Sequence, residues 1–427
     1  MGFDLEELSA RLADAVGAPH VLRAPRDLAA AGVPVGSGTP AWLVRPGAAA
    51  EIAEVLRLAS THGAQVVPVG TASRRRAERR LGPPLVVVDM KRMHHVLHLD
   101  ETSLVVHAQA GLTGLALEEL LLPRGLSLGD FPPAAMRSTL GGMLAVRTPG
   151  KSTPRHGFLE DAVLGLSAVL SDGRTIHTRV APRRATGPDL ARALLGSEGT
   201  LGVIASVVLR IHRRAETRVL DAWRVPSVAY AVDAVMAAFR QDVRPGALRI
   251  YDHAEALAHL GPDACGDGEA VVVSACAGAA TLVQVERKLL AGAMIAVDGH
   301  ALPVQLAETW WRRRTGHAVG GLAPPPPSLE FAATPSRLGR AHDAIVQAAR
   351  ATGRHARAHI SRFDDDGAVL FVTLLDGERP DPTGPARDPV IQAARAAGAR
   401  TPGERDPAMQ PYLDALKVAL DPRGALG

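Results

Sequence analysis

The chain has 427 residues, of which 47% are apolar and only 3% aromatic, so Val, Leu, Ile and Ala must fill a large core. Its 48 basic and 44 acidic residues give a formal net charge of +4, which is not the signature of a nucleic-acid-binding protein. The two cysteines, Cys265 and Cys276, are too few for a disulfide framework or a metal site. The sequence shows no signal peptide and no apolar run of ~20 residues, so we expect a cytoplasmic protein with no membrane span.

Short strands alternate with helices in the first half of the chain. Helices are expected at residues 4–16, around residues 52–59 and at residues 113–122. The expected strands are short and rich in Val and Leu, at residues 41–44, 65–68, 85–89, 96–99, 104–108, 162–170 and 202–210. This pattern predicts an α+β domain with mixed sheets. No Gly-x-Gly-x-x-Gly stands between a strand and a helix, which argues against a Rossmann fold.

Beyond about residue 214 the pattern changes to strands separated by longer helices. The strands are expected at residues 219–225, 247–250, 270–275, 328–333, 355–361 and 368–373, and the helices at residues 227–239, 281–292 and 337–351. This order predicts an antiparallel sheet covered by helices. Residues 376–389, rich in Pro, Gly and Asp, are expected to form a loop, and Pro324–Pro327 a stiff extended connector. A final helix is expected at residues 407–420.

One segment of interest reads Gly196-Ser197-Glu198-Gly199-Thr200-Leu201-Gly202 and leads into an apolar strand. Its three glycines allow the backbone to approach a ligand closely, and its N–H groups can form an anion-binding nest to which the Ser and Thr hydroxyls add donors. The alternative is an ordinary glycine-rich turn.

A second segment lies upstream and reads Ser138-Thr139-Leu140-Gly141-Gly142. A Ser or Thr followed by paired glycines offers exposed N–H groups to a pyrophosphate. The alternative is a helix cap followed by a loop.

Together, and in this order, the two segments resemble the FAD-binding domain of the vanillyl-alcohol oxidase/PCMH-type flavoproteins. Their spacing is similar to that of the alkyldihydroxyacetonephosphate synthase branch and its bacterial FAD-linked oxidase relatives. The resemblance rests on residues 138–161, 182–190 and 196–204, with weaker support from residues 104–111 and 416–422. It implies FAD as the cofactor, bound by a two-subdomain PCMH-type domain at residues 1–213. An α+β cap domain with an antiparallel sheet would follow at residues 214–427, its final helix packing back on the first domain.

The resemblance also implies which residues line the cofactor. They are glycines, small hydroxyl residues and their neighbours, namely Pro68, Gly70, Thr71, Ser73, Ser138, Thr139, Gly141, Gly142, Ser152, Glu198, Gly199, Gly202 and Ile204. The family's pyrophosphate loop reads Pro-x-Gly-Gly-Gly-Thr-Ser, whereas residues 68–73 here read Pro-Val-Gly-Thr-Ala-Ser and lack two glycines. Either an arginine among residues 74–80 replaces the lost N–H donors through charge-assisted bonds to phosphate, or these arginines form a solvated loop.

Two residues of the second domain are candidate catalytic residues by the same resemblance. Arg249 matches an arginine held near the flavin, where it would bind a phosphate or carboxylate, and the alternative is an ion pair with Asp252 or Glu255 at a sheet edge. His359 lies in the sequence His-Ile-Ser-Arg, which matches a family strand that reads His-x-Ser-His. The alternatives for His359 are a base, a phosphate ligand and a structural residue.

The family's tri-histidine segment corresponds to residues 399–405, which contain no histidine, and Pro324–Pro327 replace its tyrosine segment. The first hypothesis is an FAD-dependent oxidoreductase that acts on a small hydroxylated, anionic substrate. The second is a catalytically impaired paralogue that serves as a subunit or regulator, and the third is an ether-lipid synthase. The sequence leaves open whether the protein forms a homodimer or binds a partner subunit.

Overall fold

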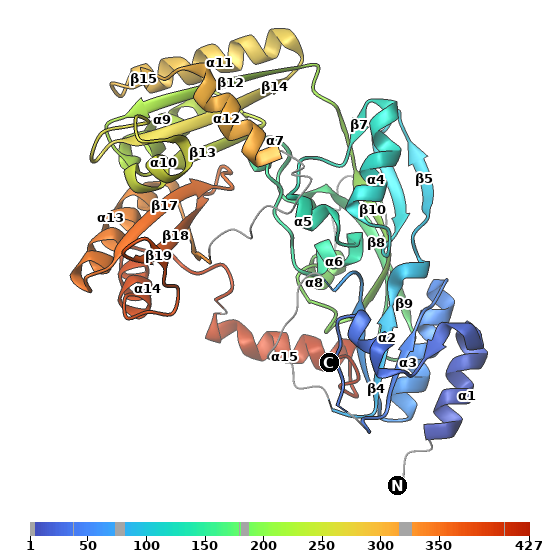
Figure 1. Ribbon diagram of the computed structural model, residues 1–427. Helices are drawn as coiled ribbons and strands as arrows, with labels where there is room; N and C mark the ends of the chain where they lie inside the picture. Colours follow the sequence, from blue (N-terminus) through green and yellow to red (C-terminus); the bar gives the residue numbers. More distant parts are fainter. Residues whose placement is uncertain are drawn as a thin grey trace. The chain divides into compact units, whose positions relative to one another are not determined.

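The computed structural model describes residues 5–36, 38–72, 82–178, 180, 188–315, 327–404 and 406–427. The chain forms two compact units (Figure 1). Unit 1 comprises Met1–Gly150, Phe158–Arg213 and Arg405–Gly427, and unit 2 comprises Lys151–Gly157 and Arg214–Glu404. Both units combine helices with sheets, which confirms the predicted α+β class.

The first sheet of unit 1 has the strand order β1-β2-β4-β3. Its strands are β1 (Val21–Leu22), β2 (Ala41–Val44), β3 (Gln65–Val69) and β4 (Leu85–Asp89), and its covering helices include α1 (Leu5–Val16) and α3 (Ala49–Thr61). β4 pairs in parallel with β2 and β3 and is buried along its whole length, as its unbroken run of apolar residues predicts. Leu8 and Leu12, one helical turn apart on α1, are fully buried.

The second sheet of unit 1 is antiparallel, with the order β5-β6-β10-β8-β9. Its strands are β5 (Val96–Asp100), β6 (Val105–Gln109), β8 (Val163–Val169), β9 (Thr175–His177) and β10 (Val203–Arg210). The prediction of two apolar strands at 162–170 and 202–210 is confirmed, because β8 and β10 are neighbours inside this sheet.

Short elements complete unit 1. They are η1 (Ala18–His20), α2 (Pro25–Ala30), η2 (Met90–Arg92), α4 (Gly114–Leu121), η3 (Leu122–Arg124), β7 (Leu126–Ser127), α5 (Pro133–Met136), α6 (Leu140–Ala145), η4 (Leu159–Ala162), α8 (Leu190–Leu194), β11 (His212–Arg213), η5 (Pro407–Met409) and α15 (Gln410–Leu420). After α15 the chain returns to β3, where Leu426 forms a parallel bridge with Val66. The carboxyl-terminal residues therefore extend the edge of the first sheet.

Unit 2 is built on one antiparallel sheet of eight strands, ordered β15-β12-β14-β13-β17-β18-β16 with β19 also paired to β18. Its strands are β12 (Thr217–Val225), β13 (Ala247–Tyr251), β14 (Ala270–Gly278), β15 (His300–Ala301), β16 (Leu329–Ala333), β17 (His355–Ser361), β18 (Ala368–Asp376) and β19 (Arg379–Pro380). Its helices are α7 (Thr153–His156), α9 (Val228–Phe239), α10 (His253–Leu260), α11 (Ala280–Ile295), α12 (Val304–Thr315), α13 (Pro335–Ala351) and α14 (Arg387–Ala396). The predicted antiparallel sheet with helices is confirmed.

The two faces of this sheet differ, because successive side chains of a strand point to opposite sides. On one face, Leu248, Ile250 and Ile360 pack in a core with residues of α9, α11 and α13. On the other face, Ala247 and Tyr251 pack with residues of α10 and α12. The alternation places Arg249 and His359 on this second face.

The expected loop at residues 376–389 is partly wrong, since it contains β19 and the first residues of α14. The helices α10, α12 and α14 were also not predicted. In α14 only Val390 and Ala394 are buried, so the apolar periodicity is too weak to indicate a helix. Among the described helices, none combines the length and apolar character that a membrane-spanning segment requires.

Candidate functional site

Three of the predicted cofactor segments meet in unit 1, at the end of β3, at the start of α6 and in the turn before β10. A Cβ atom on Gly70 would lie 2.1 Å from Thr139 Oγ1, so these two segments touch. A Cβ atom on Gly199 would lie 2.5 Å from Pro68 Cγ, which joins the third segment to the first. The two glycine-bearing segments near residues 140 and 200 are therefore brought together, as the resemblance requires.

The backbone of the turn at residues 196–202 is tied directly to α6. Gly196 N donates to Leu144 O at 3.1 Å, and Glu198 N donates to Ala145 O at 3.0 Å. Gly196 and Gly199 have φ of 78° and 77°, the left-handed region that glycine adopts without strain. Glu198 also lies there, with φ of 53°, a conformation that the surrounding contacts must impose.

The expected donors at these two segments are largely occupied. The amides of Leu140 and Gly141 donate to Leu112 O and Ala110 O, both at 2.8 Å, and Gly142 N donates to Thr139 Oγ1 at 3.2 Å. The prediction of exposed amides in this segment is therefore wrong for these three residues, and Thr139 is a helix cap. The helix cap was the alternative interpretation, and its signal is the Thr that precedes the apolar residue of α6.

The hydroxyl groups of the downstream turn are also used within the protein. Ser197 Oγ donates to Leu194 O, and Thr200 Oγ1 donates to Ser197 O, each at 2.7 Å. Their protons are therefore not directed to a ligand, contrary to the expectation for this turn. The chain packs tightly around Gly202, because a Cβ atom there would lie 3.2 Å from both Leu194 Cδ2 and Val169 O.

The remaining predicted cofactor residues are placed as follows. Thr71 is exposed just after β3, Ser138 O accepts from Gly114 N, and Ile204 is buried in β10. Ser152 is buried but belongs to unit 2. Ser73 and residues 74–80 lie outside the described residues, and so does the hypothesis that an arginine there replaces the missing N–H donors.

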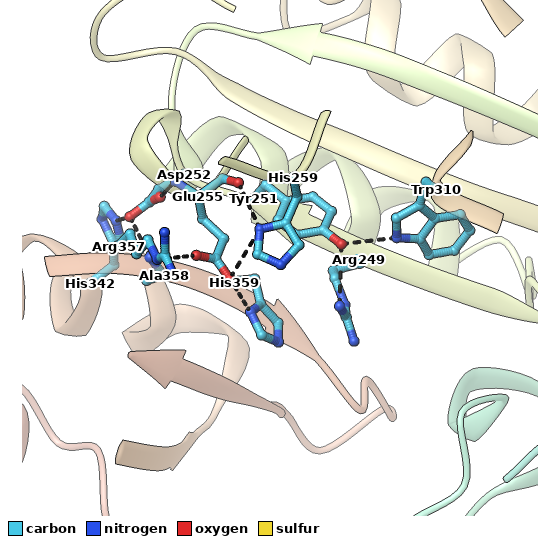
Figure 2. Close-up of polar contacts among 10 residues, drawn as sticks. All are labelled: Arg249, Tyr251, Asp252, Glu255, His259, Trp310, His342, Arg357, Ala358 and His359. Carbon is cyan, nitrogen blue, oxygen red and sulfur yellow. Dashed lines mark hydrogen bonds and ion pairs between the residues drawn. The ribbon is translucent and has the colours of Figure 1, made fainter. Parts of the chain in front are cut away.

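In unit 2, Arg249 lies on β13 beside two aromatic residues (Figure 2). Arg249 Nη1 donates to Tyr251 Oη at 3.2 Å, and Trp310 Nε1 donates to the same oxygen at 2.9 Å. Arg249 Nε is buried, and among the described residues it has no hydrogen-bond partner. The sheet-edge alternative for Arg249 is wrong, because β13 lies between β14 and β17.

His359 lies on the neighbouring strand, where it is the direct partner of Tyr251 in the ladder. Its Nδ1 lies 3.2 Å from Glu255 Oε1, and its ring stacks on Phe371 with the ring centroids 4.8 Å apart and the planes 8° from parallel. Figure 2 shows that the side chains of Arg249 and His359 project from the sheet in the same direction. The structure thus brings the two predicted catalytic residues onto one face.

Burial lowers the pKa of His359 to about 4, helped by the positive charge of Arg249 and opposed by the hydrogen bond to Glu255. Burial also works against a charge on Glu255, but the hydrogen bond from His359 and the nearby basic groups outweigh it and lower its pKa. At neutral pH we therefore expect a neutral imidazole beside an ionised carboxylate.

Glu255 and Asp252 were considered only as partners of Arg249, and their actual role was missed. Asp252-x-x-Glu255 has the form of a capping box, in which the glutamate would turn back to the helix start. Asp252 does cap α10, since its Oδ1 accepts from Glu255 N at 2.8 Å. Glu255 instead turns to His359, because Asp252 N already donates to Ala358 O at 2.9 Å.

Arg400 lies in the segment that corresponds to the family's histidines, and its backbone pairs within unit 2. Arg400 exchanges backbone hydrogen bonds with Ala332 at 2.7 and 2.9 Å, which ties it to β16. Of the proline run, Pro324–Pro326 lie outside the described residues.

Two family models match the chain. "FAD binding domain" matches residues 40–179, and "FAD linked oxidases, C-terminal domain" matches residues 214–398.

Alkyldihydroxyacetonephosphate synthase of Caenorhabditis elegans is 30% identical over 220 residues, which are 50% of this chain and 36% of that protein. The FAD-linked oxidoreductase YgcU of Escherichia coli K12 is 26% identical over 275 residues, 64% of this chain and 56% of its own length. Mitochondrial D-lactate dehydrogenase [cytochrome] of Arabidopsis thaliana is 30% identical over 220 residues, 51% of this chain and 38% of its own length. The chain thus matches less than two thirds of each relative.

Solved structures extend the likeness to nearly the whole chain. A structure of alkyldihydroxyacetonephosphate synthase has a TM-score of 0.74 at 20% identity and covers 99% of this chain and 84% of its own. p-Cresol methylhydroxylase with bound substrate has a TM-score of 0.70 at 15% identity and covers 99% of this chain and 95% of its own. At such identities the likeness shows a common fold.

Proposed function

Because the chain belongs to the FAD-linked oxidases, with the PCMH-type fold and FAD as cofactor, we propose that it is an FAD-dependent oxidoreductase that acts on a small hydroxylated, anionic substrate. The observation that carries this proposal is the pairing of a cation and a neutral imidazole, Arg249 and His359, on one face of the unit 2 sheet.

The meeting of three predicted cofactor segments in unit 1 supports FAD binding there. The end of β3, the start of α6 and the turn before β10 approach so closely that a Cβ atom on Gly70 or Gly199 would clash. We propose that Pro68, Gly70 and Thr71 together with the turn at residues 198–202 hold the dinucleotide, and that Thr139 fixes their relative position. The internal use of the α6 amides implies that the glycines of that segment serve close packing more than phosphate binding.

We propose that Arg249 binds the anionic group of the substrate. A guanidinium group presents donors in a planar fork that matches a carboxylate or phosphate. Tyr251 holds Nη1, while the buried Nε has no partner among the described residues and remains able to donate. A bound anion would offset the charge of Arg249, and the pKa of His359 would then rise toward its ordinary value.

We propose that His359 accepts the hydroxyl proton of the substrate. Neutral histidine can accept a hydrogen bond through its unprotonated ring nitrogen, and then the proton itself as the hydroxyl becomes a carbonyl. When bound, FAD supplies the acceptor for the two electrons that leave with the carbon-bound hydrogen.

The test is the purified protein with FAD, assayed with an artificial electron acceptor against small hydroxylated carboxylates and phosphates. We expect a yellow protein that turns over at least one of them, with Arg249→Met raising KM far more than Arg249→Lys does. A colourless protein that ignores added FAD would refute the proposal, and so would turnover that is insensitive to Arg249→Met.

The second candidate is a paralogue that keeps the fold but not the catalysis, and the absence of histidine from residues 399–405 favours it. It predicts bound FAD without turnover of any compound in the same assay. The third candidate, ether-lipid synthesis, predicts an alkyl product from an acyl substrate and a fatty alcohol, and it draws its support from the alkyldihydroxyacetonephosphate synthase relatives.

A further inference from the structure

Glu255 is a buried carboxylate on which three basic side chains converge (Figure 2). Its Oε1 lies 3.2 Å from His359 Nδ1 and 3.7 Å from His259 Nδ1. Its Oε2 lies 3.1 Å from Arg357 Nε. The contact with His359 is a hydrogen bond, whereas the other two are ion pairs. An ionised carboxylate accepts hydrogen bonds but cannot donate one, so the hydrogen of this bond must be on His359 Nδ1.

This requirement decides which nitrogen of His359 carries the proton. A neutral imidazole has one N–H group and one nitrogen with a free lone pair. With Nδ1–H donated to Glu255, the lone pair is on Nε2. Stacking on Phe371 fixes the plane of the ring, so the direction of that lone pair is fixed as well.

Asp252, at the start of α10, holds the helix that carries Glu255. Asp252 Oδ1 accepts from Glu255 N, and Asp252 Oδ2 accepts from Ala358 N, the residue before His359, both at 2.8 Å. His342 Nε2, on α13, lies 3.3 Å from the same Asp252 oxygen. One carboxylate therefore joins the start of α10 to β17, and it fixes Glu255 relative to His359.

We propose that Glu255 is a positioning residue of this site, which holds His359 as the Nδ1–H tautomer so that Nε2 accepts the substrate hydroxyl. The inference rests on the proposed function for the hydroxyl, but the tautomer itself is a property of the free protein. Glu255 does not touch the substrate and acts only through His359. In the reaction the proton on Nδ1 stays in place while the hydroxyl proton passes to Nε2.

The first measurement needs no substrate. Two-bond proton–nitrogen NMR of the FAD-loaded protein with ¹⁵N-labelled histidine distinguishes the two tautomers, and His359→Gln assigns the signal. We expect Nδ1–H in the wild type and a shift toward Nε2–H in Glu255→Leu. Glu286→Gln is the matched control, because Glu286 pairs with Arg155 in the same unit and should leave the signal unchanged. Nε2–H in the wild type overturns the inference whether or not any variant folds.

The second measurement is steady-state kinetics of Glu255→Leu, which removes both acceptor oxygens, whereas a glutamine would keep one. By comparison with residues that orient metal-bound histidines, we expect kcat to fall about 10–100-fold with KM and flavin absorbance little changed. Wild-type kcat in Glu255→Leu overturns the positioning role while leaving the proposed function intact. Failure of the proposed function is recognised separately, as a wild type that shows the Nδ1–H tautomer and has no turnover.

Discussion

Gly70→Ala tests whether the end of β3 and the start of α6 form one cofactor-binding surface. The added Cβ atom would lie 2.1 Å from Thr139 Oγ1 and 2.9 Å from Thr139 Cγ2. Non-bonded heavy atoms keep roughly 3.5 Å or more between carbons, so Thr139 or β3 must move by about an ångström or more. Thr139 is almost fully buried and has little room to do so.

The magnitude follows from two effects. Overpacking of a filled interior costs about 1–3 kcal/mol. Moving the Thr139 hydroxyl also breaks its bond to Gly142 N, and the loss of such a helix cap costs about 1 kcal/mol. We expect the free energy of unfolding to fall by about 2–4 kcal/mol in total. Because about 1.4 kcal/mol corresponds to a factor of ten, FAD affinity should fall roughly 10-fold or more if binding needs Thr139 in place.

The assay is titration of apoprotein into FAD, followed by flavin fluorescence, together with thermal unfolding of the apoprotein. Gly82→Ala is the control, since among the described residues its Cβ atom would meet nothing closer than Gln65 at 3.8 Å and should change neither quantity. Wild-type FAD affinity in Gly70→Ala, with an unchanged melting temperature, would refute the reasoning that these segments form one surface.

Three further predictions concern buried polar contacts. Lys417→Met removes the cation beside the buried Asp421 carboxylate, which keeps its hydrogen bonds from Ala425 N and Leu426 N. Thermal unfolding should therefore show a loss at the lower end of about 3–5 kcal/mol, and an unchanged melting temperature would contradict this. Burial lowers the pKa of His342, but its bonds to two aspartates outweigh this and raise it from 6.5 to about 9. Protonated His342 thus adds on the order of 3 kcal/mol to the free energy of unfolding. This contribution is complete below pH 6.5 and is lost as the pH rises through 9. In urea unfolding, the wild type should therefore lose stability from pH 7 to 10, and His342→Gln should not. Tyr251→Phe removes the oxygen that accepts from Arg249. We expect the free energy of unfolding to fall by about 1–3 kcal/mol and the KM for the anionic substrate to rise. An unchanged KM would show that Tyr251 does not orient Arg249.

Much of the fold could be predicted from local sequence patterns. Ala41–Val44 and Leu85–Asp89 are strands where short apolar runs predicted them, because a strand buried on both faces needs an unbroken run. The partly buried edge strand Gln65–Val69 was predicted as well. The glycines of residues 196–202 indicated a tight backbone approach, and two of them adopt the left-handed conformation. The family resemblance, which rested on residues 138–161, 182–190 and 196–204, is confirmed by the family models and the shared fold.

Partners far apart in the chain could not be predicted, because no local pattern records them. The amides of Leu140 and Gly141 donate to carbonyl oxygens near residue 111 that only the folded chain brings close, so their expected exposure was wrong. Glu255 follows Asp252 in a pattern typical of a helix start, and only the ladder between β13 and β17 brings His359 within 3.2 Å of it. The sequence by itself determined which segments become strands, helices and tight turns. Tertiary structure decided which polar group each buried donor meets, since a buried hydrogen bond depends on the place of both partners and a sequence motif specifies only one.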